Sequence, residues 1–212
     1  MVPLPNLLAF AVASIALIAL PGPSVLFVVG RSLALGRMGG FLSVLGNSLG
    51  LVPVVAAVAL GLGALVTQSA VVFTIIKFAG AAYIVYLGIQ AIRHRRSATL
   101  GAGVGIARRS PWRLLGEGFI VGMTNPKSLV FFVAVLPQFV SYPAGAVPLQ
   151  LVVLGLVFIA LALVGDSVWA LAAGTARNWF ARSPKRMEHL SASGGVMMIG
   201  LGGVLAFTGA KS

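Results

Sequence analysis

The chain has 212 residues, of which 59% are hydrophobic and only 8% are charged, and its mean hydropathy is +1.06. A soluble domain of this size carries about 25% charged residues, so the composition excludes an ordinary soluble protein and indicates a membrane protein. The formal net charge is +12, and the absence of cysteine excludes disulfides and thiolate metal sites.

Six apolar runs follow one another along the chain, each long enough to cross a bilayer core, which takes about 20 residues of helix. They cover approximately residues 6–29, 39–66, 70–92, 114–140, 147–173 and 190–209. A membrane-spanning β-barrel would show short segments of alternating hydrophobicity instead. We therefore predict an all-α integral membrane protein with six transmembrane helices and no soluble domain.

The first run is interrupted by "LPGPSVLFVV" at residues 20–29. Proline lacks a backbone N–H, and its ring clashes with the preceding helical turn, so Pro21 and Pro23 break the helix. Gly22 and Pro23 fit the N-cap and first position of a new helix, which Ser24 then continues. We expect this restart to lie near the middle of the membrane.

The fourth run is interrupted in a similar way by "GMTNPKSLVFF" at residues 122–132. Asn125 is a favoured N-cap and Pro126 is favoured at the first helical position, so a second helix restarts here beside Lys127. A helix N-terminus carries unpaired N–H groups and a partial positive charge. Two such ends at the midplane would suit an anionic group such as a carboxylate.

The two breaks together predict a substrate-binding site for an amino-acid-like molecule. In this interpretation the N–H groups near Gly22–Pro23 and Asn125–Pro126 hold the carboxylate, while Ser24, Thr124 or freed backbone carbonyls hold the amine. Lys127 adds positive charge or serves as the counter-ion of an acid. The competing interpretation is a pair of packing kinks without a ligand.

The two breaks also suggest an internal repeat within a single transmembrane domain, residues 1–212. "PGPSVLFVV" at 21–29 aligns with "NPKSLVFFV" at 125–133. The first repeat covers about 1–92 and the second about 114–212, joined by a polar, basic linker at 93–113. Three spans in each repeat would give the two halves opposite orientations, which is the plan of many secondary transporters.

Asp166 is the only acid deep in a predicted span, and intramembrane ionisable residues are functional by default. We expect it to act in ion coupling, by binding a proton or by pairing with Lys127 or an arginine; a salt bridge to loop arginines is the structural alternative. Glu117, near a span end, is expected to form an interfacial ion pair. No spacing indicates a metal site, a cofactor site or a catalytic triad, so we do not expect an enzyme.

Two small-residue pairs, Gly46 with Gly50 and Gly118 with Gly122, occur inside predicted spans. Such spacing lets helices approach closely, and close packing within the chain is favoured here over a dimer seam. Whether the protein forms a homo-oligomer is left open.

The basic residues are concentrated in alternate connections between the runs, as the positive-inside rule describes. Twelve of the 15 lie there: Arg31, Arg37, Arg93, Arg95, Arg96, Arg108, Arg109, Arg113, Arg177, Arg182, Lys185 and Arg186. This pattern predicts a protein of the inner cell membrane with these loops in the cytoplasm and both termini outside. Topology thus explains the net charge, and we expect the lipid bilayer, not a nucleic acid, as the partner of the basic residues.

The sequence resembles the lysine-exporter (LysE-type) superfamily of amino-acid efflux proteins, in particular the branch with homoserine and threonine exporters. The resemblance covers nearly the whole chain, and its most specific part is the "NPK…F…PQF" string within 118–140. It implies a small protein of about six spans that exports amino acids, driven by a proton or ion gradient. Some members carry an acid in the second span, where this chain has "GLVP" at 50–53.

The leading hypothesis is therefore a secondary transporter that exports amino acids or close derivatives. The alternatives are an exporter of another small metabolite or ion and, from a different class, a membrane scaffold subunit without a substrate.

Overall fold

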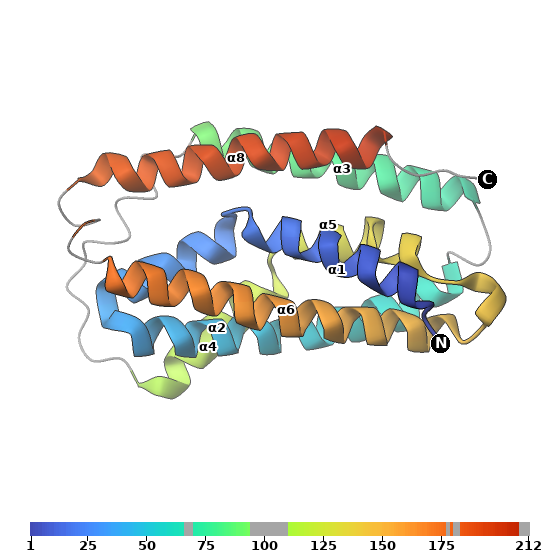
Figure 1. Ribbon diagram of the computed structural model, residues 1–212, viewed down its shortest axis with the longest axis horizontal. Helices are drawn as coiled ribbons and strands as arrows, with labels where there is room; N and C mark the ends of the chain where they lie inside the picture. Colours follow the sequence, from blue (N-terminus) through green and yellow to red (C-terminus); the bar gives the residue numbers. More distant parts are fainter. Residues whose placement is uncertain (66–69, 94–109, 177–178, 180–182, 208–212) are drawn as a thin grey trace.

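The chain is built from helices throughout the part that the structure describes. The computed structural model describes residues 1–65, 70–93, 110–176, 179 and 183–207, and these contain no strand. The predicted all-α class is confirmed (Figure 1), with the order α1 (Leu4–Ala19), α2 (Pro23–Leu65), α3 (Ala70–Arg93), α4 (Pro111–Met123), α5 (Pro126–Ala134), η2 (Leu136–Phe139), η3 (Tyr142–Ala144), α6 (Val147–Thr175) and α8 (Pro184–Phe207).

α2 consists of two helices that meet at Gly36. The φ of 77° and ψ of −177° at this residue are not helical, and glycine adopts positive φ without the penalty of a Cβ. Residues 23–35 continue from α1 toward one end of the bundle, and residues 37–65 run back from that end (Figure 1). The turn therefore falls between the first and second predicted spans.

Some of the helices are long and apolar enough to cross a membrane. By length and composition, two stretches within the described residues could cross a bilayer, Pro23–Gly61 and Val147–Thr175. A third is obtained if α4 and the following Pro126–Phe139 segment, which meet at 44°, count as one bent span. Six spans and the inverted repeat stay predictions.

α2 and α4 pack closely through the two predicted glycine pairs. A Cβ on Gly46 would collide with backbone atoms of Leu115 and Phe119, and a Cβ on Gly122 would collide with the backbone of Asn47. Gly50 and Gly118 face the opposite helix in the same way. The prediction of close packing within the chain is confirmed, and α4 is thereby fixed against the second half of α2.

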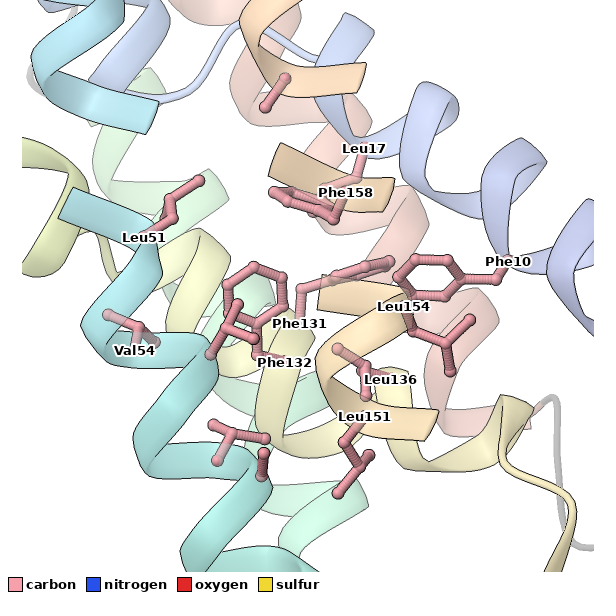
Figure 2. Close-up of a cluster of buried hydrophobic side chains, with 14 of the residues drawn as sticks. Phe10, Leu17, Leu51, Val54, Phe131, Phe132, Leu136, Leu151, Leu154 and Phe158 are labelled. Atoms are coloured by element: carbon pink, nitrogen blue, oxygen red, sulfur yellow. The ribbon is translucent and has the colours of Figure 1, made fainter. Parts of the chain in front are cut away.

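A cluster of buried aromatic rings holds α5 in place. Figure 2 shows Phe131 and Phe132 of α5 among Phe10 of α1 and Phe158 of α6. The Phe132 and Phe158 rings meet edge to face at 4.8 Å between centroids, and Phe10 lies 5.8 Å from Phe131. Such contacts add about 0.5–1.5 kcal/mol per pair beyond the buried area, so the restarted helix is anchored to both α1 and α6.

The glycine contact predicts a specific loss of stability. We expect Gly122→Ala to lower the free energy of unfolding by about 1–3 kcal/mol, because overpacking forces backbone shifts of this cost. The matched control is Gly116→Ala in the same helix, where an added Cβ would meet nothing within 4 Å. Unfolding of the purified protein in detergent micelles by sodium dodecyl sulfate measures both, and equal stability of the two variants would contradict the packing.

Candidate functional site

The first predicted break lies between α1 and α2. α1 ends at Ala19, and Leu20 already has an extended ψ of 117°. α2 begins at Pro23, and the carbonyl of Gly22 accepts the first helical hydrogen bond from the Leu26 N–H at 2.9 Å. Gly22 is therefore the N-cap and Pro23 the first residue of the new helix, as the sequence predicts.

The second predicted break lies between α4 and α5. α4 ends at Met123, and α5 begins at Pro126. Asn125 caps the new helix, because its Oδ1 accepts a hydrogen bond from the Lys127 N–H at 3.1 Å and its carbonyl accepts one from the Leu129 N–H at 3.0 Å. The predicted restart at Asn125 and Pro126 is confirmed.

The Asn125 side chain also joins the two breaks. Its Nδ2 donates to the hydroxyl of Ser24 in the first turn of α2 at 3.0 Å and to that of Ser128 in α5 at 3.1 Å. All three side chains are buried. Ser24 and Ser128 are equivalent positions in the predicted repeat alignment, so one amide connects the first turns of both restarted helices.

Lys127 reaches from α5 to the end of α1. Its ammonium donates to the backbone carbonyls of Leu17 at 3.0 Å and Leu20 at 2.8 Å, and the residue is 3% exposed. The C-terminus of a helix has unpaired carbonyls and a partial negative charge. The Lys127 ammonium stabilises this end of α1 through its hydrogen bonds and through its positive charge. The aliphatic part of Lys127 lies against Gly22, where a Cβ would come within 3.1 Å of its Cδ.

Three of the predicted site residues are less enclosed than the others. Thr124 is exposed, and its hydroxyl donates to the Ile120 carbonyl of its own helix at 2.7 Å. Pro23 is exposed as well, while Pro126 is half-buried. The buried centre of the site therefore consists of the predicted residues Gly22, Ser24, Asn125 and Lys127, together with the buried Ser128.

Asp166 of α6 lies near this centre and is 4% exposed. Its Oδ2 accepts a hydrogen bond from Asn47 Nδ2 at 2.9 Å, and its charge interacts with that of Lys127. Among the described residues, Asp166 makes no direct ion pair with Lys127 or with an arginine. Asp166 is therefore a buried acid without a direct ion pair to these residues. For the arginines that the structure describes, the alternative of a salt bridge to loop arginines is wrong.

Asn47 is a site residue that sequence reasoning missed. It is 3% exposed, and its Oδ1 has no hydrogen-bond partner. In the described part of the chain this is true of three further buried atoms, the hydroxyl oxygens of Ser14, Ser32 and Ser48. The available signal was the polar pair "NS" at 47–48 inside an apolar run.

Glu117 forms the ion pair that the sequence predicts. It bonds to Arg31 from α2 and to Arg113 one turn earlier in α4, the latter at 3.0 Å. The Arg31 guanidinium also lies over the Phe27 ring at 5.1 Å from its centroid. This cluster ties the end of the first restarted helix to α4, apart from the buried centre.

A groove of about 480 Å³ lies beside the second break, between α2 and the α4–α5 pair. Its walls include Pro53, Val58, Met123 and Val133, and all its lining side chains are apolar. Such a wall offers nothing for a charged group to bind, so the groove is not a candidate for amino-acid recognition.

The contacts of Lys127 predict a stability effect. We expect Lys127→Met to lower the free energy of unfolding by about 1–3 kcal/mol, because it removes the charge-assisted hydrogen bonds to the Leu17 and Leu20 carbonyls and the positive charge that offsets Asp166. Lys185→Met, at an exposed position of α8, is the matched control. Denaturant unfolding in micelles measures the difference, and a Lys127→Met variant as stable as the control would show that the ammonium does not hold the break.

Comparison with known proteins agrees with this architecture. The sequence model of the LysE type translocator family matches residues 15–209. An uncharacterized membrane protein of Vibrio cholerae serotype O1 is 36% identical over 94% of this chain and 95% of its own length. Homoserine/homoserine lactone efflux proteins of Salmonella typhi and Salmonella typhimurium are 31% and 32% identical, each over 93% of this chain and 94% of their own.

No solved structure matches the chain. The family model nevertheless covers most of the sequence, and the relatives align with it over nearly their whole length. The apolar helices described above agree with a multi-pass membrane protein. The chain belongs to the LysE type translocator family.

Proposed function

We propose that the protein is a secondary transporter that exports amino acids or close derivatives from the cytoplasm. The observation that carries the proposal is the pair of broken helices joined by Asn125, with Lys127 and Asp166 buried beside them. Buried charges inside a membrane bundle are costly and mark substrate or ion pathways. Family membership and the names of the two Salmonella relatives support the same class of activity.

The proposed architecture has six spans in two inverted repeats. α1 with residues 23–35 would form span one, and α4 with α5 would form span four. α2 packs on α6, and α3 packs on α8. Both contacts support the repeat, because a pseudo-two-fold axis that relates the two halves would interchange the two helices of each pair. Figure 1 shows α1 beginning and α8 ending toward the same end of the bundle, as an even number of crossings requires.

The proposed orientation places both termini outside the inner membrane. Arg31, the Gly36 turn and Arg113 would then lie at the cytoplasmic end, in agreement with the positive-inside rule. The Arg31–Glu117 ion pair would close this end of the pathway in the conformation described.

The proposed substrate site lies where the two restarted helices meet. Gly22, Pro23 and Ser24 would contribute one helix N-terminus, and Asn125, Pro126 and Lys127 the other, with Thr124 at the edge. Helix N-termini attract anions through unpaired N–H groups and their partial positive charge. A substrate carboxylate would bind there, close to the positive charge of Lys127.

Asp166 is the proposed coupling residue. It is the buried acid next to the site, and its charge interacts with Lys127. A proton taken up by Asp166 from outside and released inside would couple export to the proton gradient, as acids in transporter spans do.

The proposal is tested with purified protein in liposomes. We expect proton flow down an imposed pH gradient to drive the export of radiolabelled homoserine. The export rate should exceed the background rate of protein-free liposomes. Asp166→Asn should insert normally but reduce gradient-driven export to that background. Export by Asp166→Asn at the wild-type rate and with unchanged pH dependence would contradict the coupling role.

Two further outcomes separate the alternatives. Transport of another metabolite but of no amino acid would favour the broader exporter. No transport of any small molecule by the folded wild-type protein would favour a scaffold subunit and would contradict the proposed function.

A further inference from the structure

We propose that Asn47 and Asp166 form a subsite for the primary ammonium group of the substrate, and that protons compete with this group for Asp166. This inference rests on the proposed function and adds to it the part of the substrate that is recognised. It also assigns a role to Asn47, which the site derived from the two breaks does not include.

The side chain of Asn47 is only partly hydrogen-bonded. An ionised carboxylate only accepts hydrogen bonds, so the amide nitrogen of Asn47 must face Asp166 Oδ2, as it does at 2.9 Å. Its Oδ1 is then left as a buried acceptor without a partner. Leaving a buried acceptor unpaired is costly, and a ligand that donates a hydrogen bond would remove this cost.

The Asn47 and Asp166 side chains together suit a cation. A carboxylate and a neighbouring amide oxygen together present negative charge and acceptors only, which a primary ammonium with three N–H donors matches. Charge-assisted hydrogen bonds of this kind are about twice as strong as neutral ones. Lys127 does not fill this role in the structure, because its ammonium is bound to Leu17 and Leu20.

Several of the other acceptors expected to hold an amine are already in use. The Leu17 and Leu20 carbonyls accept from Lys127. The Ser24 hydroxyl accepts from Asn125, and the Thr124 hydroxyl is bonded within its own helix at an exposed position. Asn47 Oδ1 remains as a buried acceptor next to a negative charge.

The names of the Salmonella relatives contain two compounds, homoserine and homoserine lactone. Ring closure to the lactone consumes the free carboxylate and leaves the primary amine. The primary amine is the basic group that both compounds share, so a site that accepts both can recognise the amine and dispense with the free carboxylate. The pair of Asn47 and Asp166 meets that requirement, whereas helix N-termini alone do not.

The backbone of Asn47 is held firmly enough to position its side chain. A Cβ on Gly122 of α4 would collide with the Asn47 carbonyl, and a Cβ on Gly118 would come within 3.1 Å of its N–H nitrogen. Both glycines lie one or two turns before the break at Asn125. The α4 glycines thus fix the ammonium subsite at a set place relative to the second helix restart.

Competition for one carboxylate would couple the two fluxes. Asp166 can hold either the substrate ammonium or a proton, so a proton that binds from outside displaces the substrate there, and substrate binding inside displaces the proton. Of the elements packed on α6, α1 has no titratable side chain within its bounds. On α2, Arg31 pairs with Glu117, and Arg37 packs against Gly174, two turns of α6 from Asp166. Among the described residues, Lys127 of α5 is the charged group whose coulombic interaction with Asp166 is resolved.

The test uses competition against radiolabelled homoserine in exchange by wild-type proteoliposomes. Homoserine lactone should inhibit, while γ-butyrolactone, which lacks the amine, and N-acetylhomoserine lactone, whose amine is blocked, should inhibit at least about tenfold less. Lowering the pH on the substrate side should raise the KM for homoserine without changing the maximal rate. Replacing sodium with choline should change nothing.

The variant arm uses Asn47→Leu, which keeps the approximate size but removes the acceptor. We expect its KM for homoserine to rise about tenfold or more. Ser43→Ala is the matched control one turn earlier in α2, because the Ser43 hydroxyl donates to Gly39 within the same helix; its KM should equal that of the wild type. If Asn47→Leu fails to fold, the competition by analogues in the wild type shows whether the substrate amine is recognised.

The proposal is overturned if the amine-free lactone inhibits as well as homoserine lactone, or if folded Asn47→Leu keeps the wild-type KM. A KM that depends on sodium would assign the pair to a metal cation and would also overturn it. In these cases homoserine is still transported, so the proposed function stands. Absence of all transport by the wild type would instead overturn the proposed function and this subsite with it.

Discussion

The structure depends on how backbone groups are satisfied where two apolar helices are interrupted. In the hydrocarbon part of a membrane no water is available, so each unpaired N–H or C=O group needs a partner from the protein. Lys127 supplies donors to the Leu17 and Leu20 carbonyls, and Asn125 supplies an acceptor to α5 and a donor to Ser24. Because only Pro126 separates these two residues, the short segment at the start of α5 stabilises both breaks.

This arrangement connects stability with transport. The partners at the breaks are side chains, and side chains can exchange one hydrogen-bond partner for another without unfolding a helix. A substrate that brings its own donors and acceptors could replace them, while the glycine contacts between α2 and α4 and the aromatic cluster around Phe131 keep the surrounding helices in place. The same constraint that makes the breaks costly in lipid therefore makes them suitable for binding a small polar molecule.

Much of this could be predicted from the sequence because it follows from local rules. Proline chemistry and N-cap preference place the restarts at Pro23 and Pro126, and the spacing of Gly118 and Gly122 predicts a close helix contact. The partners of Lys127 and Asp166 could not be predicted, because they lie 107 to 119 residues away along the chain and meet only in the folded bundle. Asn47 was missed for the same reason, since nothing local distinguishes it from a polar residue that faces a neighbouring helix.

The central claim is that the two breaks form a single site that substrate occupies. Because the chain contains no cysteine, Ser24→Cys and Ser128→Cys each introduce one unique thiol, at the two hydroxyl positions that Asn125 joins. Leu60→Cys, at a position that is 80% exposed, serves as the reference. The measurement is the rate of thiol alkylation by N-ethylmaleimide in membranes with and without homoserine. We predict that homoserine slows alkylation at positions 24 and 128 and leaves position 60 unchanged, whereas unchanged rates at both 24 and 128 would contradict a shared site.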